Sequence, residues 1–321
     1  MFKSLTNIFR VQELRDRILY TVMAILVYRI GSHIPTPGID PTALLEFLSS
    51  AQGGGGLLTI MDLFSGGALF RFSILALGIM PYISASIIMQ LLGVVIPALE
   101  RMQKEGESGR KKINQYVRYL ALVLCIIQSA AMASWIQSIN EGAMIYMNPG
   151  LGFVLIVVAT ATAGTMFLMW LGDQITERGL GNGISVIIFA GIVARIPAGV
   201  YDMIQKKDSE YLNSLVIVLF FIIFAIVIFC VVYEESGQRR IPVQYAKRVV
   251  GRKVFGAQST HIPFKINPSG VIPIIFASAL MAIPAQIASL TRGIQWRWLD
   301  ALLRFFSYGS WAYIILYCLF Q

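Results

Sequence analysis

The stretch LNSLVIVLFFIIFAIVIFCVVY, residues 212–233, contains no charged side chain and is almost entirely apolar. A helix needs about 20 consecutive apolar residues to cross the hydrocarbon core of a bilayer, which is roughly 30 Å thick. This stretch supplies that length without interruption, so it predicts a transmembrane helix.

Further apolar runs lie on both sides of this stretch. Four of them are as long and equally free of charge: 72–96, 119–139, 151–171 and 271–290. Two weaker runs, 18–35 and 183–201, are broken by Arg29 and Arg195 near one end, where we expect a long side chain to reach the lipid headgroups. The last run, 311–320, spans only half of the core, so we expect the chain to stop within an eighth span. A short interfacial helix is the alternative.

The overall composition agrees with these runs. Hydrophobic residues make up 56% of the chain and charged residues 13%, whereas soluble domains carry roughly 25% charged residues. The mean hydropathy is +0.70. There is too little charge to cover a water-facing surface, so the composition excludes a soluble globular enzyme and predicts an all-α polytopic membrane protein.

The distribution of basic residues predicts the orientation. The chain has 26 Lys and Arg against 17 Asp and Glu. Assigning Lys and Arg to alternate segments between the spans gives 18 on one side and 8 on the other. The positive-inside rule then places the N-terminus in the cytoplasm, together with the loops 97–118 and 234–268.

Few side chains within the spans are suited to catalysis or ion coupling. Asp and Glu are nearly absent from them, and the chain lacks the residue sets of intramembrane proteases. The three cysteines lie in apolar runs without metal-binding spacing, so we expect no metal site. A solute transporter with broken helices remains the alternative function, and polar ligands at the midplane of the membrane would distinguish it.

The sequence DLFSGGALF, residues 62–70, precedes the run 72–96 on the outer side. Its apolar residues are poorly suited to water, so we interpret it as a plug or re-entrant element, with an ordinary surface loop as the alternative. Prolines interrupt two of the runs, and we expect each to kink or break its helix. They are Pro81, Pro273 and Pro284.

The loop 234–268 carries seven Lys and Arg, more than orientation requires. Such a basic patch is suited to anionic lipid, RNA or an acidic protein surface. The alternative is a topology signal that also meets lipid headgroups.

Several motifs together resemble the SecY family, the channel subunits of the bacterial Sec protein translocon. They occur in family order along the chain: FSGGAL at 64–69, ALGIMPYISASII at 76–88, KEGESGR at 104–110, ITERGLGNGIS at 175–185, QRRIP at 238–242, YAKR at 245–248 and AQSTHIP at 257–263. The resemblance covers the first seven spans and the start of the eighth.

The resemblance implies a clamshell of ten helices, of which about seven and a half are present. Residues 1–205 would form its N-terminal half, with the plug near 61–70, and residues 206–321 an incomplete C-terminal half. It also implies a channel that translocates unfolded preproteins across the inner membrane and releases hydrophobic segments laterally into it, without catalysis or a cofactor of its own.

The resemblance further assigns roles to individual residues. The pore ring would consist of Ile79, Ile83, Ile184, Ile188 and Ile275. The plug residues would be Asp62, Leu63, Phe64, Ser65, Gly66 and Gly67. The lateral gate would include Ser84 and Ile283. Docking of cytoplasmic partners would use Arg239, Arg240, Lys247, Arg248, Arg252 and Lys253.

By spacing alone, Ile79 and Ile83, like Ile184 and Ile188, share a helix face, which is equally typical of ordinary packing. The partners implied by the resemblance are the SecE and SecG subunits, the SecA motor ATPase, the translating ribosome, preprotein signal sequences and anionic lipid. The implied location is the bacterial inner membrane.

Overall fold

The computed structural model describes residues 11–42, 44, 62, 65–139, 150–205, 214–243, 248–250, 253–255, 260–265 and 318. The chain divides into two compact units. One comprises Met1–Pro197 with Ile275–Gln321, and the other comprises Ala198–Ile274. The predicted halves, 1–205 and 206–321, stay a prediction.

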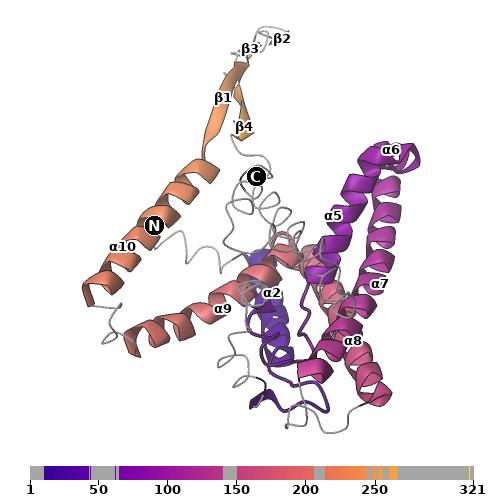
Figure 1. The fold of residues 1–321 in the computed structure, drawn as a ribbon. Helices are drawn as coiled ribbons and strands as arrows, with labels where there is room; N and C mark the ends of the chain where they lie inside the picture. Colours follow the sequence, from indigo (N-terminus) through magenta and orange to yellow (C-terminus); the bar gives the residue numbers. More distant parts are fainter. Residues whose placement is uncertain are drawn as a thin grey trace. The chain divides into compact units, whose positions relative to one another are not determined.

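The described part of the chain is mostly helical, which confirms the predicted class (Figure 1). Its long helices in chain order are α2 (Gln12–Gly31), α5 (Met80–Val95), α6 (Pro97–Lys104), α7 (Glu107–Ile139), α8 (Leu151–Arg178), α9 (Gly183–Gln205) and α10 (Ser214–Glu235). Within the described residues, α7, α8, α9 and α10 are each long and apolar enough to cross a membrane, and α5 with α6 qualifies as a bent pair. The predicted spans 271–290 and 311–320 lie outside the described residues, apart from Cys318.

The second predicted span begins later than the sequence suggested. A helix was expected from Phe72, but residues 66–79 form turns and α5 starts at Met80. Phe72 and Gly78 have φ angles of 44° and 57°, values that interrupt a right-handed helix. Hydropathy did not reveal this, because the turns are as apolar as the helix that follows them.

The prediction of a kink at Pro81 is wrong, because α5 begins only at Met80. Pro81 lies in the first turn of α5, where the missing N–H would have no partner in any case. The sharp bend comes at Pro97 instead, where α5 and α6 meet at 103°. Ile96 is extended, as a residue before proline prefers. Pro273 and Pro284 lie outside the described residues.

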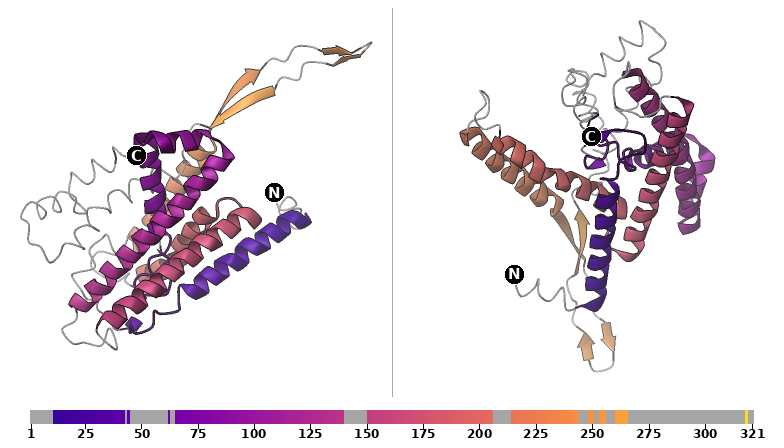
Figure 2. Two further views of the ribbon diagram at one scale, coloured as in Figure 1. Left: turned by 90° about the vertical axis from the view of Figure 1, so that its right-hand side faces the viewer. Right: turned by 90° about the horizontal axis from the view of Figure 1, so that it is seen from below.

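The first unit is built from helices packed side by side (Figure 2). α7 packs against both α5 and α8, and α2 packs along α8. Gly164 of α8 lets that helix approach the turns before α5 closely, because a Cβ there would come within 2.0 Å of the Ile74 carbonyl oxygen. The irregular segment is thus packed directly against a helix.

The second unit contains α10 and a β-hairpin. None of the span-length window of α10 is buried against the rest of the described chain. Strand β1 (Gln238–Val243) pairs antiparallel with β4 (Thr260–Lys265), and β2 (Arg248–Val250) pairs with β3 (Lys253–Phe255). The described part of the basic loop 234–268 therefore contains two two-stranded ladders that we did not predict.

Candidate functional site

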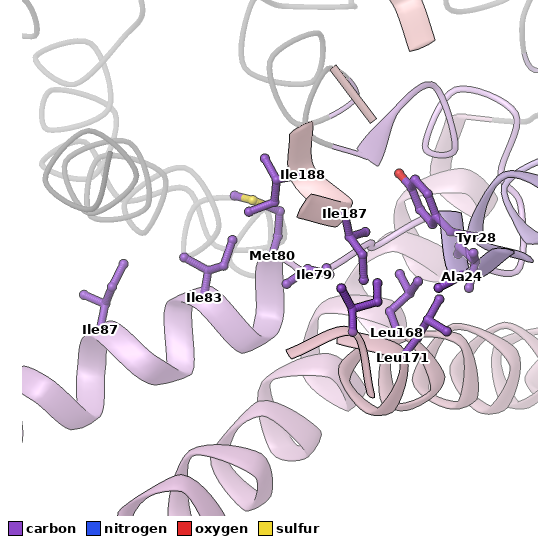
Figure 3. Packing of buried hydrophobic residues seen from close by; sticks show 12 residues of the cluster. Ala24, Tyr28, Ile79, Met80, Ile83, Ile87, Leu168, Leu171, Ile187 and Ile188 are labelled. Carbon is purple, nitrogen blue, oxygen red and sulfur yellow. The ribbon is translucent and has the colours of Figure 1, made fainter. Parts of the chain in front are cut away.

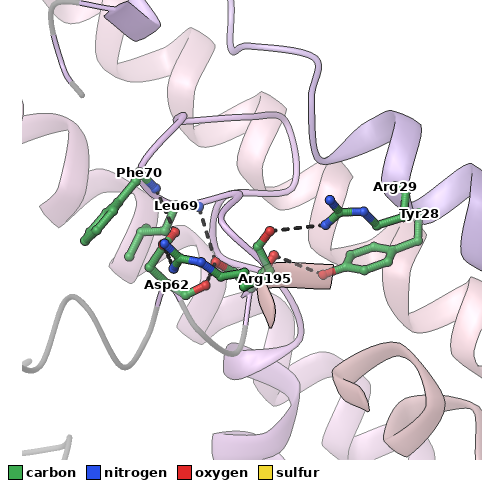
Figure 4. A network of polar contacts seen from close by, with 8 residues as sticks. Tyr28, Arg29, Asp62, Leu69, Phe70 and Arg195 are labelled. Carbon is green, nitrogen blue, oxygen red and sulfur yellow. Dashed lines mark hydrogen bonds and ion pairs between the residues drawn. The ribbon is translucent and has the colours of Figure 1, made fainter. Parts of the chain in front are cut away.

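A short segment, residues 62–70, precedes α5 in the chain (Figure 4). We call it the docked segment; Asp62 and residues 65–70 of it are described. The Ser65 hydroxyl donates to the Asp62 carbonyl oxygen at 3.1 Å and accepts from the Leu69 N–H at 3.2 Å. The Phe70 N–H donates to Asp62 Oδ1 at 2.9 Å. These bonds hold the turns at residues 66–70 against Asp62.

The end of α2 holds the docked segment through its backbone. The Tyr28 hydroxyl donates to the Ser65 carbonyl oxygen at 2.9 Å, and Arg29 Nη1 donates to the Gly66 carbonyl oxygen at 3.2 Å. Tyr28 is buried. Arg29 was expected to extend to lipid headgroups, which stays a prediction; in the structure it donates to a carbonyl group of the turn.

Helix α9 holds the docked segment through a side chain. Arg195 Nη1 forms an ion pair with Asp62 Oδ2, and the guanidinium lies 5.9 Å from the centre of the Phe70 ring. The Asp62 side chain is fully buried, whereas that of Arg195 is 35% exposed. Arg195 was also expected to reach the headgroups. In the structure its charge compensates the buried Asp62 carboxylate, and the contact with headgroups stays a prediction.

The backbones of the docked segment and α9 approach closely at Gly66. Gly66 has a φ angle of +69°, and a Cβ added there would lie 2.9 Å from the Cα of Gly191 and 3.0 Å from the Tyr28 hydroxyl oxygen. A side chain at this position would meet both a strained backbone and a neighbouring backbone. Glycine is therefore required for the observed docking.

Figure 3 shows an apolar cluster that includes Tyr28, the residue that binds the Ser65 carbonyl oxygen of the docked segment. Ile79, Ile83 and Ile188 are buried in it, and Ile184 is partly buried against it. Ile79 caps α5, and its carbonyl oxygen accepts the Ile83 N–H at 3.1 Å. The other buried members come from four parts of the chain: Ala24, Tyr28, Leu75, Met80, Ile87, Leu168, Leu171, Ile175 and Ile187.

The remaining predicted site residues fall into three groups. Ser84 is buried in α5. Arg239 and Arg240 are exposed on β1, and Arg248 and Lys253 lie on β2 and β3. The others lie outside the described residues: Leu63, Phe64, Lys247, Arg252, Ile275 and Ile283.

Sequence reasoning missed two of the groups that hold the docked segment. Tyr28 was not singled out, and Asp62 and Arg195 were not paired, although each was noted for itself. The signal was a lone acidic and a lone basic residue, each in apolar surroundings. Because a charge in such surroundings needs a partner, two of opposite sign indicate a pair.

Comparison with known protein sequences gives one consistent result. The sequence model of the SecY family matches residues 73–321. Protein translocase subunit SecY of Escherichia coli K12 is 51% identical over 306 residues, which cover 95% of this chain and 69% of that protein. The SecY subunit of Aquifex aeolicus is 45% identical over 323 residues, covering 100% of this chain and 74% of the relative.

Solved structures share the fold at lower sequence identity. A protein-conducting channel matches with a TM-score of 0.60 at 20% identity, covering 87% of this chain and 59% of that one. Sec61 in the canine ribosome–channel complex matches with a TM-score of 0.58 at 19% identity, covering 87% and 59%. A SecY structure described for its plug domain matches with a TM-score of 0.53 at 21% identity, covering 87% and 58%.

Proposed function

Because the chain belongs to the SecY family, we propose that it passes unfolded preproteins across the inner membrane and releases hydrophobic segments laterally into the lipid. The observation that carries this proposal is the similarity to bacterial SecY along almost the whole chain. Those relatives are translocase subunits, so the chain is a membrane channel subunit and not an enzyme.

The apolar cluster supports a role for its isoleucines in closing the channel. In the proposal, Ile79, Ile83, Ile184 and Ile188 contribute to a constriction together with Ile275. Branched apolar side chains repel water, so a narrow passage lined by them blocks ions while it yields to a sliding polypeptide. The burial of Ile79, Ile83 and Ile188 in one cluster, with Ile184 partly buried against it, supports this role.

The docked segment serves as the plug in this proposal. It precedes α5, and among its described residues the polar contacts with α2 and α9 are two hydrogen bonds and one ion pair, beside the close approach of Gly66 to Gly191. A few polar contacts can be broken and remade without unfolding a helix, as a reversible closure requires.

A lateral gate at Ser84 and Ile283 is part of the same proposal. Helix α5 contains no charged residue, so it can part from a neighbouring helix without exposing a charge to lipid. Ser84 is buried in the described part of the chain.

The hairpin of the second unit is proposed to dock cytoplasmic partners. Arg239 and Arg240 are exposed on β1, and further basic residues follow at 247, 248, 252 and 253. An exposed basic surface suits the SecA motor ATPase, the ribosome and anionic lipid headgroups. SecE and SecG are the proposed small subunits, and the charge count supports a cytoplasmic N-terminus.

Reconstituted transport tests the function. The protein is assembled with SecE and SecG in vesicles, and a preprotein is added with SecA and ATP. We expect the preprotein to become protected from protease only when its signal sequence is intact. Uptake of a small polar solute into the vesicles, without protection of the preprotein from protease, would favour a solute transporter.

A further inference from the structure

We propose that the ion pair between Asp62 and Arg195 is the latch that holds the channel closed, so that its rupture is a step in opening. The proposal rests on the proposed plug function of the docked segment. It adds the side-chain contact by which α9 controls the position of that segment.

The two carboxylate oxygens of Asp62 divide the task between them. Oδ1 accepts the Phe70 N–H at 2.9 Å, which closes the docked segment on itself. Oδ2 binds Arg195, which is 133 residues away in the sequence. One buried side chain thus shapes the segment and also fastens it to a helix.

Helix α9 is built to receive the segment at this place. Gly191 and Arg195 are four residues apart, so they lie on the same face of α9. Gly191 allows the Gly66 backbone to approach, and Arg195 supplies the charge one turn further along. The contacts from α2 differ in kind, because Tyr28 and Arg29 bind backbone carbonyl groups of the docked segment and not the Asp62 carboxylate.

The burial of Asp62 links the latch to the state of the pore. With its side chain fully buried, Asp62 is stabilised by Arg195 in an environment of low dielectric constant, and a buried carboxylate without its partner is strongly unfavourable. Water that enters an opening pore raises the local dielectric constant and weakens the attraction. Hydration and unlatching therefore reinforce each other, which makes opening cooperative.

Thiol labelling of the closed channel tests the latch. Ala68 is fully buried in the docked segment, so Ala68→Cys is introduced into a channel whose Cys125, Cys230 and Cys318 are replaced by Ala or Ser. The labelling rate with a membrane-impermeant maleimide is measured in vesicles without substrate. We expect Asp62→Asn and Arg195→Gln each to raise that rate at least about tenfold, because each removes the ion pair that fastens the segment to α9, and Arg195→Gln also leaves the buried Asp62 carboxylate without its partner.

The double variant Asp62→Asn/Arg195→Gln decides whether the two residues act as a pair. We expect it to label no faster than the faster single variant, because the interaction is already lost. Arg195→Lys keeps the charge and is expected to label more slowly than Arg195→Gln. A double variant whose labelling rate rises by the product of the two single increases would overturn the latch. Equal labelling rates for Arg195→Lys and Arg195→Gln would also overturn it.

The chain offers a matched control. Arg118 and Asp173 form an ion pair between α7 and α8 at 2.6 Å, with side chains 48% and 38% exposed. Arg118→Gln and Asp173→Asn should change labelling at position 68 by less than about twofold, because exposed pairs contribute little. If wild-type vesicles transport a preprotein and the single variants at 62 and 195 label like wild type, the latch alone is rejected. If wild-type vesicles fail to transport, the proposed function is rejected.

Discussion

At the residue scale, the docked segment meets α9 at a glycine. Gly66 and Gly67 both have positive φ angles, +69° and +86°. A Cβ on Gly66 meets Gly191 and Tyr28, whereas a Cβ on Gly67 meets no atom within 4 Å. The pair therefore separates the cost of backbone strain from the cost of a steric clash.

Gly66→Ala is expected to undock the segment, whereas Gly67→Ala is not. Both variants carry the strain of a positive φ, of the order of 1 kcal/mol, but only alanine at 66 forces the segment away from α9. Ion leak through vesicles without substrate measures the effect, and we expect it to rise clearly for Gly66→Ala only. Equal leak in the two variants would show that close approach at Gly66 does not matter for closure.

Polar replacement of the cluster isoleucines tests the constriction. Ile83→Asn and Ile188→Ser place a hydrogen-bonding group among apolar neighbours, so water enters more readily. We expect higher resting conductance and transport of preproteins with defective signal sequences. Ile87→Asn, one turn further along α5 and buried in the same cluster, is the control, and it should destabilise packing without this change in selectivity.

At the element scale, the β1–β4 ladder shows why the strands escaped prediction. Each strand contains a proline, Pro242 in β1 and Pro263 in β4, paired with His261 and Arg240. Proline normally argues against a strand, because it cannot donate to the ladder. In a two-stranded ladder every strand has a free edge, so proline is tolerated there.

Charge reversal on β1 tests whether this element docks a partner. Arg239→Glu with Arg240→Glu should weaken SecA or ribosome binding at low salt, and Arg239→Gln with Arg240→Gln should weaken it less, because the first adds repulsion and the second only removes attraction. The dissociation constant is measured at several salt concentrations. Affinity equal to wild type at low salt in both variants would leave the hairpin as a topology signal alone.

Helices were predictable from the sequence to the extent that hydropathy changes where a helix ends. The run from 183 was predicted to begin where α9 begins, because the glycines before it are turn residues. In the structure, Asn182 Oδ1 accepts the Ile184 N–H at 3.0 Å, as at a helix N-cap. The start of α5 was missed because the turns before Met80 are apolar. Their conformation is imposed by packing against α8 and α2, which no local pattern reports.

At the scale of the whole molecule, the candidate site was predictable residue by residue but not as an arrangement. The resemblance supplied Asp62 and the isoleucines, while the pairing of Asp62 with Arg195 depends on two segments far apart in the chain. Only the fold brings them together. The same holds for Tyr28, whose role is visible only through its bond to Ser65.

The lateral gate gives a prediction at this scale. Replacing Ser84 and Ile283 with cysteine should allow a disulfide, which needs Cα atoms within about 7 Å. Locking the bond should stop transport, and reduction should restore it, because a signal helix could not leave into lipid. Transport that continues with the bond formed would show that substrates do not need this seam, and a bond that never forms would contradict the proposed helix arrangement.

The most direct test of the central claim is to locate a polypeptide inside the channel. A photoreactive amino acid is placed at Ile83 or Ile188 and, as a control, at Leu155, an exposed residue on α8, and a preprotein is arrested during transport. We predict that the arrested chain crosslinks to positions 83 and 188 and not to 155. Equal crosslinking at all three positions, or none at 83 and 188 while transport proceeds, would contradict a polypeptide path through the apolar cluster.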